Sequence, residues 1–548
     1  MQAAIPKQRE GGIPYKWILT MVVILGAFMS ILDTTIVNIA IPRLETAFGA
    51  GVNNVEWVLT GYTLAQGVAV PLVAYFTDRL GIKRFYIFSL TAFTIGSALC
   101  GLAWSLPMLI LFRVIQGLGG AALLPLSMTL LFSVFPPKER GVALGVFGVP
   151  VLLAPAIGPT LGGYLVTYAS WQVIFYLNVP IGILAVFLSF LFIRDHQERK
   201  RPRFDLVGFC FVTVGLALTL YGLSSASSDG WGSTTVMGCL GVGIVSLIIF
   251  TFVELGISKR GGNPLLNLSL FANGPFSSSN IASILITFTL FGGLFLIPIY
   301  LQNLRQLDAF QAGLVLLPQA LASMVAVVVG GRLVDKLGVK AVVIPGLFAL
   351  GISTWFMLTV DRHTSLAWFQ VLLILRGVSL GLITQPLSVS MMVDIPPRQL
   401  AQATSLSTVA RSVATSLGVA VLATVLATQV TNHYGHLVEQ VTPLSKLGEM
   451  LYGLQAHFVA HGASLAPAHA AALQEISLFI KSEAFVLAMQ DAFRLTLLLL
   501  VAALIAVLLM RTKKKQAAST PGFSTEAEDG ALNEEEAAAA RAEAMLAG

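Results

Sequence analysis

Long apolar runs alternate along this chain with short segments that hold most of its charged residues. Each run is roughly 18–28 residues long, which at about 1.5 Å per residue allows a helix to cross a hydrocarbon core of about 30 Å. Because a segment in lipid must satisfy its own backbone polar groups, we predict that these runs are α-helices. The alternating segments of about ten residues that a transmembrane β-barrel requires are not seen.

About fourteen such runs can be counted, so the chain is predicted to be an all-α polytopic membrane protein. The first six runs begin near Trp17, Glu56, Arg84, Pro107, Gly141 and Trp171, the next two near Asp205 and Thr234, and the last six near Phe276, Phe310, Ala341, Leu366, Ala403 and Leu487.

Composition supports a membrane protein, and the distribution of charge predicts how the chain is oriented in the membrane. Of the 548 residues, 56% are hydrophobic and only 11% are charged, whereas soluble domains hold about 25% charged residues. The net charge of +6 is interpreted as the basic bias of cytoplasmic loops, so no nucleic-acid partner is expected. If the N-terminus is cytoplasmic, Lys and Arg are roughly five times more frequent on the cytoplasmic side, and both termini are expected there.

A short charged pattern occurs twice, after the second run and after the tenth. Asp78 to Lys83 and Gly331 to Lys340 both read as acid, base, apolar, Gly, apolar, base. Two homologous six-helix bundles separated by two extra helices explain this placement, and parallel repeats of this kind are typical of transporters. The charged pairs either latch one side of the molecule closed or are solvated turns. The residues concerned are Asp78, Arg79, Gly81, Lys83, Gly331, Asp335, Lys336 and Gly338.

The repeat and the charge pattern together predict a domain organisation. It consists of a cytoplasmic N-terminal segment (1–16), a six-helix bundle (17–193), a basic cytoplasmic linker (194–204), two extra central helices (205–254), a second cytoplasmic linker (255–275), a second six-helix bundle (276–510) carrying an extracytoplasmic insert (428–485), and a cytoplasmic tail (511–548).

Ionisable residues deep inside apolar runs are costly and are therefore functional candidates. Asp33 lies well inside the first run, where its carboxyl would bind and release a proton as its exposure changes sides, unless it is a static buried acid. Arg113 in the fourth run cannot lose its proton, so it needs anionic or carbonyl partners, and Asp33 is one candidate. Arg376 and Arg411 raise the same question in the second bundle. Asp491 and Arg494, spaced i, i+3, are expected to form a local ion pair.

The fifth run is rich in proline and glycine, which does not suit a straight, featureless helix. Pro155 and Pro159 interrupt it, and Gly158 and Gly162 permit close contact with another helix. We interpret this run as a bending helix at the interface between the bundles, with static close packing as the alternative.

The sequence offers no credible catalytic or metal site. It contains neither a phosphate-binding loop that would indicate ATP hydrolysis nor a His-Glu-x-x-His motif. The match of Gly377 to Gly381 to Gly-x-Ser-x-Gly lies inside a span, where the required strand-to-helix turn cannot form. The three cysteines suit neither a metal site nor a disulfide framework. An enzyme is therefore not expected.

Taken together, these motifs resemble the major facilitator superfamily, and more narrowly its fourteen-span drug:proton antiporters of the EmrB/QacA type. Leu32 to Pro42 looks like the first-span signature, Arg113 to Gly117 like the fourth-span motif and Trp171 to Gly182 like a sixth-span signature. Gly158-Pro159 and Gly162-Gly163 match the end of the antiporter motif. The first charged loop departs from the family pattern, because Ala74 stands where Gly is usual and Ile82 where a base is usual.

The resemblance implies a secondary transporter in a bacterial cytoplasmic (inner) membrane that exports amphipathic or cationic compounds in exchange for protons. It implies Asp33 and Arg113 as coupling residues, no cofactor beyond the proton gradient, and peripheral extra helices. Some relatives work with a periplasmic adaptor protein, for which the 428–485 insert is one possible contact. A lid and a solvated loop are the alternatives for the insert.

The central cavity is expected to present polar or aromatic side chains from the spans. The candidates are Asn38, Tyr62, Gln66, Gln116, Asn178, Phe288, Tyr300 and Gln302. The motifs do not separate drug export from export of an endogenous lipid or metabolite. A non-transporting membrane sensor that keeps the fold is the remaining alternative.

Overall fold

The computed structural model describes residues 14–136, 139–194, 204–262, 264–442 and 444–510. The tail 511–548, nearly all of the N-terminal segment 1–16 and the centre of the linker 194–204 lie outside the described residues. Within the described residues the chain is helical and contains no β-strand, which confirms the all-α prediction.

Ten helices form the first bundle because several spans are broken. They are α1 (Tyr15–Phe48), α2 (Val52–Val55), α3 (Trp57–Ala69), α4 (Leu72–Leu80), α5 (Ile82–Gly101), α6 (Leu106–Gly120), α7 (Leu123–Val134), α8 (Arg140–Tyr168), α9 (Gln172–Tyr176) and α10 (Asn178–Phe192). α3 and α4 together make one bent span, with an angle of 58° at the break before Leu72. Pro71 lies at this break and cannot donate a backbone hydrogen bond.

Two further helices, α11 (Leu206–Asp229) and α12 (Thr234–Lys259), pack against each other before the second bundle. The remaining elements are η2 (Leu268–Ala272), α13 (Gly274–Ile299), η3 (Tyr300–Leu304), α14 (Ala309–Leu337), α15 (Val339–Met357), α16 (Leu366–Met391), η4 (Pro397–Gln399), α17 (Leu400–Glu439), α18 (Lys446–Ala460) and α19 (Leu465–Leu509).

Ten helices among the described residues are long and apolar enough to cross a membrane, and the bent α3–α4 pair would be an eleventh. The protein is therefore a multi-pass membrane protein with the predicted two bundles and two extra helices. Length and apolarity alone do not confirm the number fourteen.

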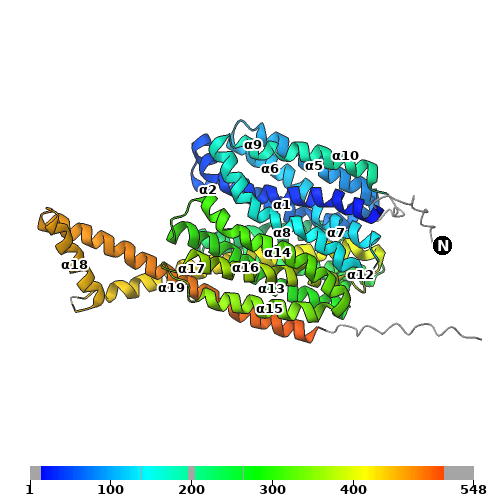
Figure 1. Cartoon of the computed structure of the whole chain (residues 1–548). Helices are drawn as coiled ribbons and strands as arrows, with labels where there is room; N and C mark the ends of the chain where they lie inside the picture. Colours follow the sequence, from blue (N-terminus) through cyan, green and yellow to red (C-terminus); the bar gives the residue numbers. More distant parts are fainter. Residues whose placement is uncertain (1–13, 137–138, 195–203, 263, 443, 511–548) are drawn as a thin grey trace, which may run out of the picture. The chain divides into compact units, whose positions relative to one another are not determined.

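The predicted insert 428–485 is built from helices. α17 continues as far as Glu439, α18 follows, and α19 begins at Leu465, well before the apolar run expected near Leu487. Figure 1 shows α17 and α19 side by side, with α18 at the far end of this hairpin. The hairpin has a hydrophobic cluster of its own, formed by Leu451, Ala472, Ile476 and Ile480.

The two copies of the charged pattern have the same backbone conformation. Gly81 separates α4 from α5 with φ of 85°, and Gly338 separates α14 from α15 with φ of 87°. Both angles are in a region that side chains with a Cβ atom rarely adopt, which explains the glycine in each copy. We call this end of the molecule, which also holds the N-terminus of α8, the charged-loop end.

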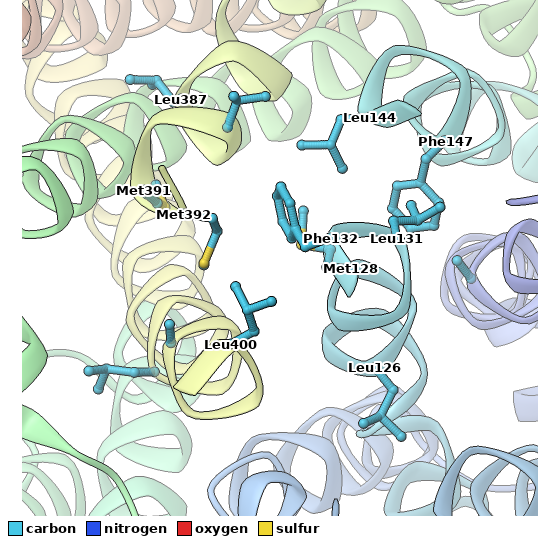
Figure 2. Close-up of a cluster of buried hydrophobic side chains, with 14 of the residues drawn as sticks. Leu126, Met128, Leu131, Phe132, Leu144, Phe147, Leu387, Met391, Met392 and Leu400 are labelled. Carbon is cyan, nitrogen blue, oxygen red and sulfur yellow. The ribbon is translucent and has the colours of Figure 1, made fainter. Parts of the chain in front are cut away.

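The two bundles share a hydrophobic core at the charged-loop end. Figure 2 shows Phe132 and Leu144 of the first bundle facing Met391, Met392 and Leu400 of the second. The hydroxyls of Thr129 on α7 and Thr404 on α17 lie 3.0 Å apart across this contact.

Toward the other end, the hydrophobic clusters of the described residues are separate. One cluster joins Leu32 and Ile36 to other residues of the first bundle only. A second cluster joins Leu296 and Leu301 to other residues of the second bundle only. The structure is thus closed across the bundles at the charged-loop end.

Candidate functional site

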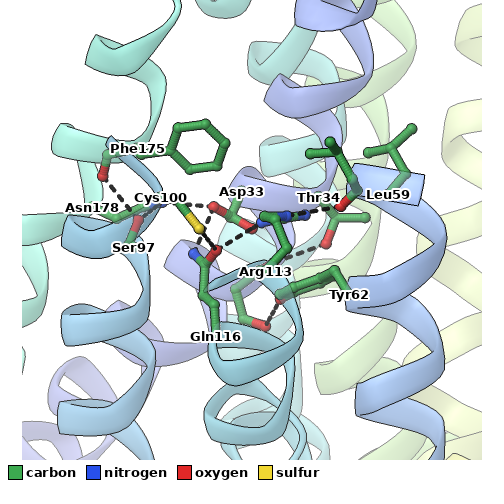
Figure 3. A network of polar contacts seen from close by, with 12 residues as sticks. Asp33, Thr34, Leu59, Tyr62, Ser97, Cys100, Arg113, Gln116, Phe175 and Asn178 are labelled. Atoms are coloured by element: carbon green, nitrogen blue, oxygen red, sulfur yellow. Dashed lines mark hydrogen bonds and ion pairs between the residues drawn. The ribbon is translucent and has the colours of Figure 1, made fainter. Parts of the chain in front are cut away.

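Asp33 occupies a dry position in the middle of the first bundle. It lies on α1, and the residue is 1% exposed. Oδ2 accepts a hydrogen bond from Arg113 Nη1 at 2.5 Å, and Oδ1 accepts from Gln116 Nε2 and Asn178 Nδ2, each at 2.9 Å. Figure 3 shows these side chains converging on the carboxylate from α6 and α10. Three donors around one carboxylate match its ionised form.

Arg113 is fully buried and held on several sides. Its Nε donates to the backbone oxygen of Val58 at 3.0 Å, and Nη1 also donates to Gln116 Oε1 at 2.8 Å. The guanidinium carbon lies 4.0 Å from the centre of the Tyr62 ring, whose face attracts a cation. Nη2 has no hydrogen-bond partner among the described residues, so the aromatic contact replaces one.

A second layer orients the amide groups that face Asp33. Asn178 Nδ2 also approaches Ser97 Oγ at 3.2 Å, and Ser97 donates to the backbone oxygen of Phe175 at 2.9 Å. The Cys100 thiol lies 3.6 Å from Gln116 Oε1. Neither Ser97 nor Cys100 was among the candidate residues that the sequence indicated. Their spacing of three places on α5 puts both on the face toward Asp33, but many small residues share such a spacing.

A proton on Asp33 would not fit this arrangement of donors unchanged. A proton on the carboxyl would place a donor against the donors of Arg113, Gln116 and Asn178. The new O–H would need an acceptor, which none of these three donor atoms offers, so the network would have to rearrange around it. Because the three donors come from α6 and α10, such a rearrangement would change the contacts of α1 with at least one of these helices.

Two further predicted cavity residues lie beside this network. Gln66 Nε2 donates to the Tyr62 hydroxyl at 2.8 Å, and Ser30 Oγ lies 3.4 Å from the same hydroxyl. Tyr62 therefore connects Arg113 on one side with a small polar group on the other.

The other predicted cavity residues lie apart from Asp33. Asn38 and Gln302 are exposed, and Phe288 packs beside the hydrophobic cluster of the second bundle. Tyr300 is buried, and its hydroxyl donates to the backbone oxygen of Asp361 at 2.8 Å, which anchors a turn.

α8 connects the neighbourhood of Asp33 with the second bundle. Gly158 packs against Thr35 of α1, and a Cβ atom at Gly158 would collide with the threonine side chain. Gly162 packs against Ile36 in the same way, at 3.3 Å. Thr35 Oγ1 lies 3.4 Å from the backbone oxygen of Ala154. Pro155 and Pro159 lie within the same continuous helix.

The other end of α8 contacts the second bundle. Asp335 of α14 accepts hydrogen bonds from the backbone nitrogens of Gly141 and Val142, at 3.2 and 3.1 Å. A carboxylate at a helix N-terminus satisfies free N–H groups and complements the helix dipole. Gly331 fits against the backbone oxygen of Gly141, so a side chain at either position would force the helices apart.

The remaining residues of the charged loops are placed at the same end. Arg79 Nη1 donates to the Tyr75 hydroxyl at 2.6 Å, and Lys83 donates to the backbone oxygen of Phe190 at 2.8 Å. Asp78 begins the first copy of the pattern, near the end of α4, and Lys336 lies in the last turn of α14.

The other ionisable residues of the second bundle differ from Arg113. Arg376 is 2% exposed, and no hydrogen bond or ion pair joins it to the residues that the structure describes. Arg411 contacts the sulfur of Met128 at 3.9 Å. Asp491 and Arg494 form the predicted ion pair, and His433 Nε2 also lies 2.8 Å from Asp491.

Comparison with known proteins places these features in a family. The family model described as Major Facilitator Superfamily matches residues 23–419. An uncharacterized MFS-type transporter, YhcA of Bacillus subtilis (strain 168), is 33% identical over 424 residues, covering 77% of this chain and 79% of that protein. The multidrug export protein EmrB of Escherichia coli (strain K12) is 32% identical over 441 residues, covering 79% of this chain and 85% of EmrB.

A solved structure has the same fold at low sequence identity. The human organic anion transporter MFSD10 superposes with a TM-score of 0.57 at 15% identity, covering 89% of this chain and all of that chain.

Proposed function

The chain belongs to the major facilitator superfamily and is a transporter rather than an enzyme, and we propose that it exports amphipathic or cationic compounds in exchange for protons. The observation that carries the proposal is the buried carboxylate of Asp33, which is surrounded by the donors of Arg113, Gln116 and Asn178. A carboxylate of this kind in a membrane protein is suited to bind and release a proton.

In the proposed cycle, protonation of Asp33 releases part of its hydrogen-bond network and changes how α1 packs. Thr35 lies two positions along α1 and touches Gly158, so the change reaches α8 directly. The N-terminus of α8 in turn contacts Asp335 at the charged-loop end. A shift of α8 would therefore weaken the contact between the bundles there and favour the opposite facing state.

The substrate class rests on the relatives. EmrB is a multidrug export protein, and the multidrug transporter protein MdtP of Bacillus subtilis is 29% identical over 419 residues. We propose the same class of substrate for this protein. We also propose that it lies in a bacterial cytoplasmic membrane with both termini cytoplasmic, where the proton gradient supplies the energy. Tyr62 and Gln66, beside the Asp33 network, are the proposed contacts for substrate on the first bundle.

Transport in energised inverted membrane vesicles tests the proposal. Adding ethidium to vesicles that contain the native chain is expected to release protons from the lumen, which a pH-sensitive dye reports. Asp33→Asn removes the titratable group but keeps the side-chain size, so the dye response should disappear.

Asp361→Asn is the matched control, because Asp361 is an exposed carboxylate in a turn far along the chain from Asp33. Its dye response should equal that of the native chain. An undiminished response in Asp33→Asn, at equal protein insertion, would overturn the coupling scheme.

A further inference from the structure

A large cavity lies in the second bundle at the end opposite the charged-loop end. Its volume is about 1250 Å³, and it is lined by the turn after η3, the turn between α15 and α16, and parts of α17, α18 and α19. The bundle therefore supplies one wall and the 428–485 hairpin supplies the other. The family match ends at residue 419, so the hairpin wall lies outside the matched region.

Three cationic side chains line this cavity. They are Arg305, Arg362 and Lys481, and Glu475 is the one acidic residue among the lining residues. Among the described residues, no ion pair joins any of the three cations to a carboxylate. Several cationic side chains that line one cavity and lack carboxylate partners attract an anion.

The backbone around Arg305 holds its side chain in place. Arg305 Nη1 donates to the backbone oxygens of Arg362 and Thr364, at 2.8 and 2.7 Å. Gln306, the next lining residue, has φ of 54°, and it is the one non-glycine residue with positive φ within the described part of the chain. Such a conformation persists where the surrounding structure fixes it, and it is frequent at binding sites.

Apolar side chains form the rest of the lining. Phe479 and Phe485 of α19 face the cavity, and the guanidinium carbon of Arg362 lies 5.1 Å from the centre of the Phe479 ring. Leu304 and Leu454 line it from the bundle and from α18. The cavity thus combines an apolar surface with a positive one, which matches a ligand with a hydrocarbon body and one anionic group.

We propose that this cavity binds an amphipathic anion, with its carboxylate, sulfonate or phosphate group against Arg362 and Lys481 and its apolar body against Phe479 and Phe485. The site is separate from the Asp33 network, and the proposal goes beyond proton-coupled export, since binding here requires no transport. The anionic group belongs either to a compound with a single hydrocarbon chain or to the head group of a membrane lipid.

Calorimetric titration of the full chain in detergent-free nanodiscs tests the proposal. Octanoate and dihexanoyl phosphatidate are the two probes, because both are water-soluble amphipathic anions. Octylammonium, which has the same chain length as octanoate and the opposite charge, is the control ligand. At least one anion should bind the native chain, and octylammonium should not compete with it. Stronger binding of octanoate would assign a single-chain ligand, and stronger binding of phosphatidate a lipid.

Charge removal gives the decisive comparison. Arg362→Gln combined with Lys481→Gln should weaken anion binding about tenfold or more, because hydrogen bonds to charged groups contribute more than neutral ones. Lys446→Gln is the matched control, since Lys446 is an exposed lysine of α18 that does not line the cavity.

Lys481→Gln alone should have a smaller effect of the same sign, and because Lys481 is exposed, the variant keeps the fold. Equal affinity in the double variant and in Lys446→Gln would overturn the proposal, as would equal binding of octylammonium. Neither result depends on whether Asp33 couples transport to protons.

Discussion

At the residue scale, the central feature is a buried charge pair between α1 and α6. Asp33 and Arg113 are both inaccessible to water, and their contact is direct. Their pairing was foreseeable, because each is an ionisable residue deep in an apolar run and each needs a partner. Asn178 was a predicted cavity residue, but its hydrogen bond to Asp33 was not foreseen. The contributions of Ser97 and Cys100 were harder still to predict, since a small polar residue in an apolar helix usually bonds to its own backbone.

Removing one member of the pair should be costly. Arg113→Met would leave Asp33 as an uncompensated buried charge, and breaking such a pair costs about 3–5 kcal/mol. We expect a clear loss of thermal stability in detergent-solubilised protein. Combining Arg113→Met with Asp33→Leu should recover most of the loss, because the buried charge is then gone. A double variant no more stable than the single variant would contradict the pairing.

Arg376 should behave in the opposite way. It is buried without a hydrogen-bond or ion-pair partner among the described residues, so Arg376→Met removes a buried charge and breaks no such contact. The melting temperature should stay the same or rise. A fall as large as that of Arg113→Met would show that Arg376 has a partner in the folded protein.

At the element scale, α8 is the helix that links the proposed proton site to the second bundle. Its glycines face α1 at one end and α14 at the other. The glycines were expected to permit close helix contact, and Gly158 and Gly162 do pack closely against α1. The predicted bending of this helix stays a prediction, since α8 is one continuous helix in this structure. The sequence did not reveal the break between α3 and α4, or the early start of α19, because apolar periodicity does not mark where a helix bends or extends into a polar segment.

The α1–α8 contact can be tested with a matched pair of glycines. Gly158→Ala would place a methyl group against Thr35, whereas Gly163→Ala would meet no atom within 4 Å. We expect Gly158→Ala to lower the rate of ethidium transport in vesicles several-fold, since overpacking typically costs about 1–3 kcal/mol. Gly163→Ala should transport at the native rate. Equal rates in both variants would remove the α1–α8 contact from the mechanism.

At the scale of the whole molecule, the described structure is one closed arrangement of two bundles. The closure consists of the shared hydrophobic core, the Thr129–Thr404 contact and the Asp335 contact with α8. The two bundles and the repeat were predictable, because the charged pattern recurs at equivalent places. The facing state was not, since both states of a transporter must satisfy the same apolar pattern and differ by only a few kcal/mol.

Cross-linking at the charged-loop end measures this closure. With Cys100, Cys210 and Cys239 replaced by Ala, Thr129→Cys and Thr404→Cys should form a disulfide readily, because the two hydroxyls lie 3.0 Å apart. Adding Asp335→Asn weakens the charged contact with the N-terminus of α8 and should lower the rate of cross-linking. An unchanged rate would mean that Asp335 does not stabilise the closed state.

The most direct test of the account is proton release on substrate binding by the purified protein in weakly buffered solution. If ethidium and a proton compete through Asp33, adding ethidium should release protons from the native chain and none from Asp33→Asn, while both still bind the dye. Equal proton release from the two proteins would contradict coupling at Asp33.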